Sequence, residues 1–248
     1  MLGSFGLTLN GDSVRLPMTA QRLLAFLALQ DRPLLRAHVA GSLWPDTTER
    51  RAGANLRSTL WRLGEACPAL LTVEGASLEL APSVEVDVRH GIALTRRLLA
   101  RPPSQMEAEA PEVLFRDILP DWSDDWVILE REHYRQLRLH ALESLCAQMT
   151  TLGKFPEAVE AGLAAVAAEP LRESAHRTLI AAHIAEGNRG EAARQYGLFR
   201  RLLREELGLD PSDLMKELVR GLRHVAVLGF AVAAGLLANG ADVHVTMG

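Results

Sequence analysis

Arginine side chains gather between residues 49 and 63, in the stretch ERRAGANLRSTLWRL, together with an asparagine, a serine and a tryptophan. Guanidinium groups suit phosphate oxygens and guanine edges, and an asparagine amide suits the edge of adenine, so this set has the chemistry of a DNA-binding surface. The alternative is a solvated amphipathic helix, because arginine-rich exposed faces are common. The candidate contact residues are Arg36, Arg50, Arg51, Asn55, Arg57, Ser58, Trp61 and Arg62.

The spacing of apolar residues in this stretch predicts a single helix, and we expect Trp61 on its exposed side. Side-chain oxygens at residues 46–48 predict an N-cap, and Glu49 places a carboxylate at the positive end of the helix dipole. A shorter helix from residue 34 and a turn at Pro45-Asp46 precede it, which is the order of a helix-turn-helix. The apolar side consists of Ala52, Leu56, Leu60 and Leu63.

The flanking sequence predicts the elements that would position these two helices. Residues 2–16 alternate apolar with small or polar side chains around a hairpin-type turn at Asn10-Gly11-Asp12, which predicts a small antiparallel sheet. Residues 21–29 predict a strongly apolar helix that supports the core. Residues 70–73 and 77–80 straddle a turn and predict a two-stranded wing.

Charge divides the chain into two unlike halves, although the net charge is only −4. Residues 1–101 hold 12 Lys+Arg against 9 Asp+Glu, whereas residues 102–248 hold 15 against 22. This asymmetry favours a DNA-facing half joined to an acidic half that contacts partners. The two cysteines, Cys67 and Cys146, lack metal-ligand spacing and fit a reducing cytoplasm, and the N-terminus does not have the pattern of a signal peptide.

Residues 2–88 resemble the winged helix-turn-helix domain of the OmpR type, as it occurs in SARP-type antibiotic-regulatory activators. The resemblance implies that the third helix enters the major groove and that the wing touches the DNA backbone or the minor groove. Leu35 departs from the family, which usually has a Ser or Thr helix cap there, and Gly75-Ala76-Ser77-Leu78 replaces the usual Gly-x-Gly-Tyr of the wing. Glu79 would repel phosphate if it pointed inward. The matching residues are the run 23–29, Arg36, Leu43-Trp44, Leu56, Leu60, Arg62-Leu63 and Val86-Asp87.

The clearest break in the chain is Arg101-Pro102-Pro103, and we place the domain junction near it. Two prolines favour a stiff spacer, and residues 115–126 are apolar enough to need cover, so we expect the two domains to pack together. A long helix is expected over residues 127–151. Trp122 and Trp126, near its start, are interpreted as packing anchors in preference to a ligand cage, because the helices that follow need a cap.

An internal repeat occupies the second half. Four residue types recur 34 residues apart, which is the period of the tetratricopeptide repeat. Such helix pairs stack into a concave surface that suits protein binding. The repeated pairs are Leu145/Leu179, Gly153/Gly187, Glu157/Glu191 and Ala158/Ala192.

The second half is also similar to the bacterial transcriptional activator domain that follows the DNA-binding domain in the same family. Together the two resemblances cover nearly all of residues 2–223, and they imply activation by recruitment of RNA polymerase, often from dimers on direct repeats. The segments that carry the second similarity are Glu169-Pro170-Leu171-Arg172-Glu173, Gly187-Asn188-Arg189, Glu191-Ala192, Tyr196 and Glu206-Leu207-Gly208-Leu209-Asp210-Pro211.

Catalytic signatures are missing from the sequence, which has no phosphate loop, nucleophile elbow, zinc-protease motif or dinucleotide fingerprint. The pairs His133/His140 and His176/His183 lie seven residues apart, without an acidic or cysteine partner at ligand spacing. We interpret them as helix-surface histidines. The expectation is therefore a protein that is not an enzyme and needs no cofactor and no metal.

The sequence predicts a mainly α protein, with a winged helix-turn-helix domain of α+β type over residues 1–100 and an all-α, TPR-like activator domain over residues 101–223. Residues 224–248 form an apolar tail, whose 14-residue apolar run is shorter than the roughly twenty residues that span a bilayer, so a packed or self-associating tail is favoured over a membrane anchor.

The expected function is sequence-specific transcriptional activation in the cytoplasm, at the nucleoid. Double-stranded promoter DNA and RNA polymerase holoenzyme are the expected partners, and a homodimer is left open. The alternative is a TPR-like interaction scaffold whose winged helix no longer binds DNA.

Overall fold

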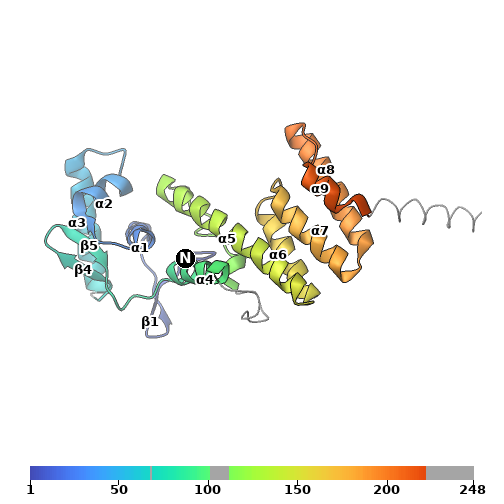
Figure 1. The fold of residues 1–248 in the computed structure, drawn as a ribbon. Coiled ribbons are helices and arrows are strands. Elements are labelled where there is room, and N and C mark those ends of the chain that lie inside the picture. The colour runs from blue at the N-terminus through green and yellow to red at the C-terminus, as the bar shows by residue number, and fades with distance from the viewer. Residues whose placement is uncertain (68, 101–111, 222–248) are drawn as a thin grey trace, which may run out of the picture. The chain divides into compact units, whose positions relative to one another are not determined.

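A computed structural model describes residues 1–67, 69–100 and 112–221 of the chain. These residues are mainly helical and form two compact units. The first unit comprises residues 1–100 and 112–141 of the described chain, and the second comprises residues 142–221. Figure 1 labels the helices α1–α9 and several of the strands. The predicted fold class, a winged helix-turn-helix followed by helical repeats, is confirmed.

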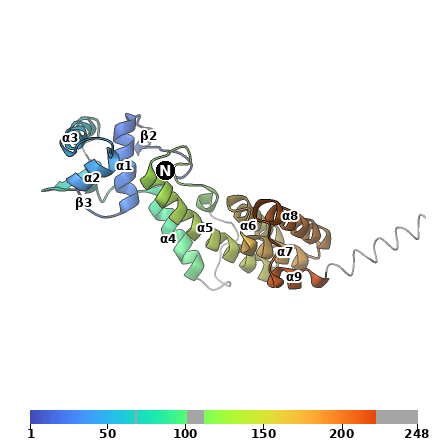
Figure 2. The ribbon, with the colours of Figure 1, turned by 90° about the horizontal axis from the view of Figure 1, so that it is seen from above.

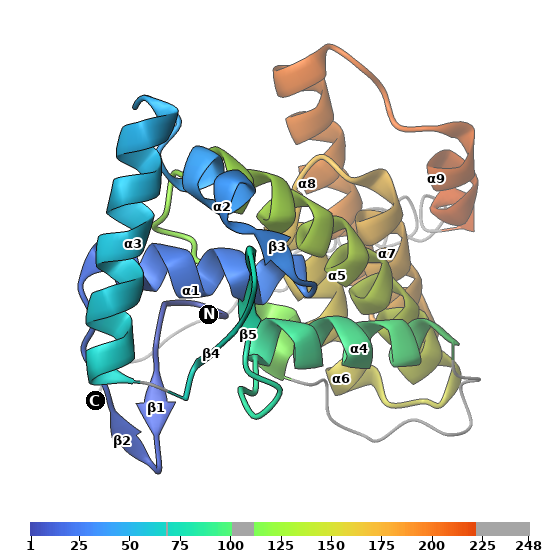
Figure 3. The same cartoon turned by 90° about the vertical axis from the view of Figure 1, so that its left-hand side faces the viewer.

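Three helices form the centre of the first unit: α1 (Met18–Gln30), α2 (Arg36–Leu43) and α3 (Glu49–Ala66). The six residues 23–28 of α1 are all buried, as expected for a helix that is apolar on nearly every side. Figure 3 shows α3 crossing α1, with α2 beside both. The predicted helix-turn-helix order is therefore present.

Two small antiparallel sheets flank these helices. Strands β1 (Thr8–Leu9) and β2 (Asp12–Ser13) form the first, around a turn in which Asn10 and Gly11 both have positive φ angles. The second has the order β3-β5-β4, with bounds Leu34–Leu35 for β3, Leu71–Glu74 for β4 and Ser77–Leu80 for β5. The predicted wing is the β4–β5 hairpin, and the predicted N-terminal sheet is present but shorter than expected.

Strand β3 corrects the sequence-based expectation, which begins the first helix of the motif at residue 34. Leu34 instead pairs with Leu78, and Leu35 pairs with Ser77. This pairing joins residues more than forty positions apart, so the local apolar pattern does not reveal it. Helix α2 begins at Arg36, one residue after the strand ends.

The first unit continues beyond the winged helix. Helix α4 (Asp87–Ala100), the short 3-10 helix η2 (Glu112–Phe115) and the first part of α5 (Asp125–Thr151) pack together (Figure 2). A Cβ added at Gly91 of α4 would lie 3.1 Å from the Tyr134 hydroxyl of α5, so a larger residue here would push the hydroxyl by a few tenths of an ångström. The Tyr134 hydroxyl in turn donates to the Val113 carbonyl at 2.9 Å.

The two tryptophans near the start of α5 are packing anchors, as predicted, and some of their partners belong to the winged helix. The Trp126 ring meets Phe26 of α1 edge-on, with centroids 5.2 Å apart, and Trp122 stacks on Phe5 at 6.0 Å. Nearby, Arg22 of α1 donates to Asp124 at 2.5 and 3.0 Å. Both rings also pack on a buried cluster that includes Val127 and Tyr134 of α5, so they contact the winged helix as well as the helix that follows. The domain bounds 1–100, 101–223 and 224–248 stay predictions.

The second unit contains the last part of α5 with α6 (Phe155–Ala168), then α7 (Glu173–Glu186), α8 (Arg189–Leu207) and the short α9 (Asp213–Leu218). Helix α7 lies between α6 and α8 (Figure 1). A Cβ at Gly162 of α6 would lie 3.0 Å from Leu179 of α7 and 3.2 Å from Cys146 of α5, so glycine lets these three helices approach one another.

The predicted repeat is visible in equivalent structural positions. Gly153 and Gly187 both follow the end of a helix with a positive φ, 73° and 88°, two residues after α5 and directly after α7. The alanines that follow, Ala158 and Ala192, are both fully buried. Each pair thus performs the same task 34 residues later, which supports two stacked helix pairs.

The interpretation of the histidines holds for one pair only. His133 and His140 are exposed, but His176 and His183 are buried, with exposed fractions of 1% and 9%. The His176 Nε2 lies 2.9 Å from the Pro170 carbonyl, which can only accept, so Nε2 carries the proton and Nδ1 accepts from Gln195. Burial lowers the pKa of His176, which keeps the ring neutral. A seven-residue spacing identifies a helix face but not what covers it.

The described residues hold no group of three or more side chains suited to a metal ion, and none of their helices is long and apolar enough to cross a membrane. Cys67 and Cys146 are both free thiols and both buried. Burial raises the pKa of Cys146 to about 11, so that it stays protonated. The apolar tail of residues 224–248 lies outside the described residues.

Candidate nucleic-acid interface

Helix α3 buries one side and exposes the other. Ala52, Leu56 and Leu63 are buried against the core of the first unit, and Thr59 on the same side donates to the Asn55 carbonyl at 2.9 Å. These positions repeat at three- and four-residue spacing, which keeps them on one face of a helix. The predicted helical phase is therefore confirmed.

The candidate residues lie largely on the opposite side. Six of the eight are exposed, while Arg36 and Asn55 are half-buried. Trp61 is 65% exposed, as predicted, which is unusual for so large an aromatic side chain. The six exposed candidates are Arg50, Arg51, Arg57, Ser58, Trp61 and Arg62.

These exposed residues form two rows, because each residue turns the helix by about 100°. Arg50 and Trp61 lie on one row together with Arg57, seven positions after Arg50. The second row contains Arg51, Ser58 and Arg62. The sequence pattern groups Arg50, Arg51 and Arg62 on one polar side, which holds only in the broad sense that all three are exposed.

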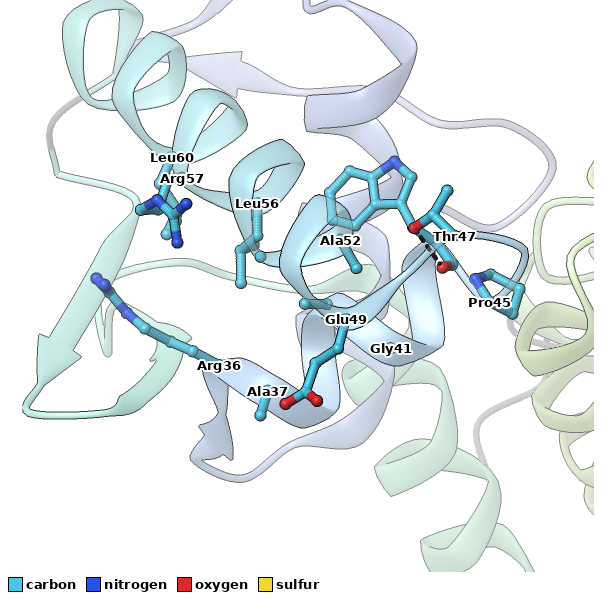
Figure 4. A pocket seen from close by; sticks show the side chains of 13 residues that line it. Arg36, Ala37, Gly41, Pro45, Thr47, Glu49, Ala52, Leu56, Arg57 and Leu60 are labelled. Carbon is cyan, nitrogen blue, oxygen red and sulfur yellow. Dashed lines mark hydrogen bonds between the residues drawn. The ribbon is translucent and has the colours of Figure 1, made fainter.

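A groove of about 410 Å³ separates α2 from α3. Its wall is largely apolar and includes Ala40, Leu56 and Leu60. In Figure 4, Arg36 of α2 and Arg57 of α3 extend at the same end of this groove, away from Pro45. The Nε atom of Arg36 is buried and has no hydrogen-bond partner among the described residues. The fold thus brings together two guanidinium groups that lie 21 positions apart in the sequence.

The four arginines of α3 form no ion pair with an acidic side chain in the described chain. The acidic residues of α3, Glu49 and Glu65, stand near its two ends. A face of unpaired guanidinium groups attracts anions, and phosphate accepts two parallel hydrogen bonds from each such group. Chemically, this face can bind a polyanion or hydrogen-bond the edges of bases.

The start of α3 differs from the prediction. Thr48 occupies the N-cap position, but its side chain makes no capping hydrogen bond. The neighbouring Thr47 hydroxyl instead donates backward to the Trp44 carbonyl at 3.1 Å. Leu35, at the N-cap of α2, likewise offers no capping group, as its type predicts. Both helices of the motif therefore begin without a side-chain cap.

The wing carries the opposite charge. Cross-strand pairing places Thr72 opposite Glu79 and Glu74 opposite Ser77, so both carboxylates lie on one face of the β4–β5 hairpin. These four residues and Pro33 line a small hollow of about 130 Å³. The sequence holds no lysine or arginine between Arg62 and Arg89. The hairpin therefore offers a phosphate no cation, and Glu79 is half-buried.

Sequence reasoning does not find the contacts that hold residues 112–126 against α1 and the N-terminal strand region. Leu2 forms an isolated antiparallel bridge with Ile118, and Gly3 donates to the Asp117 carbonyl at 2.8 Å. The Arg131 guanidinium binds the carbonyl oxygens of Ile118, Leu119 and Trp122. The only sequence signal is the apolar character of residues 115–126.

Comparison with known proteins matches residues 108–223 to the model of the bacterial transcriptional activator domain. The chain is 27% identical over 233 residues to the regulatory protein AfsR of Streptomyces coelicolor, and the aligned region covers 84% of this chain and 22% of that protein. It is 37% identical over 89 residues to AfsR of Streptomyces griseus, covering 36% of this chain and 9% of that protein. The chain thus spans less than a quarter of the length of these relatives.

Among solved structures, Mycobacterium tuberculosis EmbR in complex with a low-affinity phosphopeptide has a similar fold, with a TM-score of 0.63 and 19% identity. The similarity covers 90% of this chain and 64% of that one. At this level of identity it concerns the fold alone. The matched activator domain and the AfsR relatives support a SARP-type family of bacterial transcriptional activators as the group that this chain resembles.

Proposed function

We propose that this chain is a sequence-specific DNA-binding protein that activates transcription at promoters. Helix α3 enters the major groove, the row of Arg51, Ser58 and Arg62 reads base edges, and the remaining arginines bind phosphates. The observation that carries the proposal is the exposed face of α3, where four arginines have no acidic partner among the described residues. Long, forked donors on one helix face suit both phosphate and guanine.

The two guanidinium groups at the end of the α2–α3 groove fit the same account. Arg36 and Arg57 extend from different helices toward the same space (Figure 4), and the Arg36 Nε atom has no partner among the described residues. A backbone phosphate is the ligand that two adjacent guanidinium groups prefer. Such a phosphate contact would fix the position of α3 along the major groove of the DNA without reading the base sequence.

The partners follow from the family and remain part of the proposal. Promoter DNA is bound by the first unit, and RNA polymerase holoenzyme is recruited by the activator domain, whose stacked helix pairs suit protein contacts. A homodimer on direct repeats is the assembly that the family resemblance implies, and the cytoplasm, at the nucleoid, is the proposed location. The relatives are named as regulatory proteins, in line with a chain that is not an enzyme.

Selection from a random pool tests the DNA-binding half of the proposal. The full chain is incubated with duplexes that carry a randomised segment, and the bound fraction is amplified and sequenced over several rounds. One enriched motif is expected, duplicated as a direct repeat if the chain binds as a dimer. A pool that stays random would refute sequence-specific binding.

Transcription in a purified system tests the other half. RNA polymerase holoenzyme transcribes a template in which the selected motif lies upstream of a weak promoter. We expect more transcript when the full chain is added and no increase when the motif is scrambled. Equal transcript from both templates would leave a DNA-binding protein that is not an activator.

A protein-interaction scaffold is the second candidate, and the acidic wing favours it. Glu74 and Glu79 face the same side of a hairpin that has no cation. A scaffold should show no dependence of DNA binding on salt, because no counterions are released when no phosphate is bound. Titration of a duplex with the full chain at several salt concentrations separates the two candidates.

A further inference from the structure

Helix α8 carries an unusual concentration of positive charge in the second unit. It contains five arginines against three glutamates, whereas the rest of residues 142–221 holds 5 Lys+Arg against 9 Asp+Glu. All five arginines are exposed. Helix α8 therefore has a net positive charge, whereas the rest of residues 142–221 is net acidic.

The arrangement of these arginines follows from the buried side of α8. Ala192, Phe199 and Leu203 face the core of the second unit. At about 100° per residue, Arg194 and Arg201 lie opposite these buried residues with Glu205 beside them, small residues form the adjoining row, and the other arginines lie along the far edge of that row. The small residues are Gly190, Ala193 and Gly197. One edge holds Arg189, Arg200 and Arg204, and the other holds Arg194 and Arg201.

This strip is open in the described chain. A Cβ added at Gly190 or at Gly197 would meet no atom within 4 Å. Acidic neighbours occupy only two of the arginines, since Arg194 lies 3.1 Å from Glu191 and Arg204 lies 3.3 Å from Asp210. Exposed pairs of this kind are weak and exchange readily. The other three arginines have no ion pair with a described residue.

The chemistry of the strip fits a phosphodiester backbone better than a protein. Protein interfaces have a core of large apolar or aromatic side chains, and the middle of this strip has none. Small residues let a phosphate come close to the helix while guanidinium groups reach it from both edges. From Arg189 to Arg204 the strip is about 22 Å long, a distance over which one strand of DNA carries about six phosphates.

We propose that the exposed face of α8 binds the backbone of double-stranded DNA without reading its sequence, as a second contact separate from α3. This contact supplies positive charge that the first unit lacks, since the wing is acidic and residues 1–101 have a net charge of only +3. Because both α3 and α8 then bind phosphates, both contribute to the salt dependence of the affinity of the full chain for DNA. The proposal rests on the proposed function only in taking DNA as the polyanion.

The test measures how the affinity of the full chain for a random-sequence duplex depends on salt. The variant Arg200→Ala/Arg201→Ala removes one cation from each edge of the strip. Its plot of log affinity against log salt should be shallower than that of the unchanged chain by about 1.8, because each lost phosphate contact contributes about 0.9. Its affinity at moderate salt should fall by roughly three- to tenfold.

Two matched variants make the result specific. Lys216→Ala/Arg220→Ala removes the same charge from the same unit but from the α9 region, where both cations have an acidic neighbour three residues earlier. We expect it to leave the slope unchanged. Arg200→Lys/Arg201→Lys keeps the charge and should retain most of the slope. Circular dichroism melting of each variant checks that the fold is intact.

The proposal is overturned if Arg200→Ala/Arg201→Ala has the same slope and affinity as the Lys216→Ala/Arg220→Ala control. With an unchanged slope and affinity, the ligand of the strip would be an acidic protein and not DNA. Failure of the proposed function looks different, because the Arg51→Ala variant would then bind the selected operator as tightly as the unchanged chain, whatever happens at α8.

Discussion

Helix α3 and the β4–β5 hairpin belong to one compact unit, and a winged helix presents both elements to DNA, yet in this chain they carry opposite charge. The helix exposes four arginines and has its two glutamates near its ends. The hairpin has no cation and places Glu74 and Glu79 on the same face. We therefore expect the helix to supply the DNA contacts and the hairpin to contribute little or to oppose them.

The opposite charges of α3 and the hairpin also show which residues the fold constrains: the buried residues are constrained, and the exposed ones are not. Both elements give their inner residues to the same core, which contains Leu56 and Leu63 of α3 together with Leu78 and Leu80 of β5. Their outer residues have no packing task, so their charge can differ without cost to the fold. Charge on the outer faces is therefore the property in which function can vary while the fold stays the same.

The largest effect is expected on α3. Replacing Arg51 and Arg62 together by alanine should weaken binding to the selected operator by about 100-fold or more, since each base or phosphate contact is worth roughly 1–3 kcal/mol. Both side chains are exposed, so the melting temperature should not change. Fluorescence anisotropy with a labelled operator measures the affinity. Arg96→Ala/Arg97→Ala, an exposed pair on α4, is the control, and equal losses in both variants would remove the special role of α3.

The next largest effect on DNA affinity is expected when the charge of the wing is reversed. Glu74→Lys/Glu79→Lys should raise DNA affinity by about tenfold at low salt, and less at high salt, because the new cations release counterions from the duplex. Glu74→Gln/Glu79→Gln separates lost repulsion from added attraction and should give a smaller gain. If neither variant changes the affinity, the hairpin lies away from DNA and the comparison with α3 concerns only one DNA-facing element.

Trp61 should have an intermediate effect. Because its side chain is 65% exposed, Trp61→Ala should leave the free energy of unfolding within about 0.5 kcal/mol. Loss of a large aromatic contact with the sugar-phosphate backbone should weaken operator binding by roughly three- to tenfold. Trp61→Phe should lose less. A lower melting temperature with unchanged affinity would show that the ring packs within the protein.

The smallest effect is expected at the start of α3. Thr48→Ala should change the free energy of unfolding in urea by less than about 0.5 kcal/mol, since Thr48 makes no capping hydrogen bond. Ser212→Ala is the contrasting case, because the Ser212 hydroxyl accepts from the Met215 amide at the start of α9 and contacts Glu173. Loss of a working cap typically costs about 1 kcal/mol. Equal costs at both sites would mean that Thr48 caps α3 in solution.

Much of this site can be predicted from the sequence because its information is local. The spacing of Ala52, Leu56 and Leu63 sets the phase of α3, and that phase places Trp61 on the exposed side. The 34-residue repeat is local in the same sense, since each glycine and alanine performs its task within its own helix pair. Neither inference depends on which helices and strands pack against one another.

The errors arise where distant residues meet. Leu34 joins a strand because Leu78 is there to pair with it, and His176 is buried because Gln195 and Phe199 cover it. The joint placement of Arg36 and Arg57 at the end of one groove escapes prediction for the same reason, although the sequence makes both residues candidates. Residue types identify chemistry that can occur, whereas the fold decides which groups act together.

Repeating the operator selection with the Arg51→Ala variant tests most directly the claim that α3 reads the DNA. If α3 reads base edges, this variant should select a motif that has lost its preference at one position and keeps the others, while the wing variant Glu79→Lys should select the unchanged motif. The contradicting result is an Arg51→Ala variant that selects the full motif with the affinity of the unchanged chain, together with a Glu79→Lys variant that alters the motif. The hairpin, and not α3, would then read the DNA.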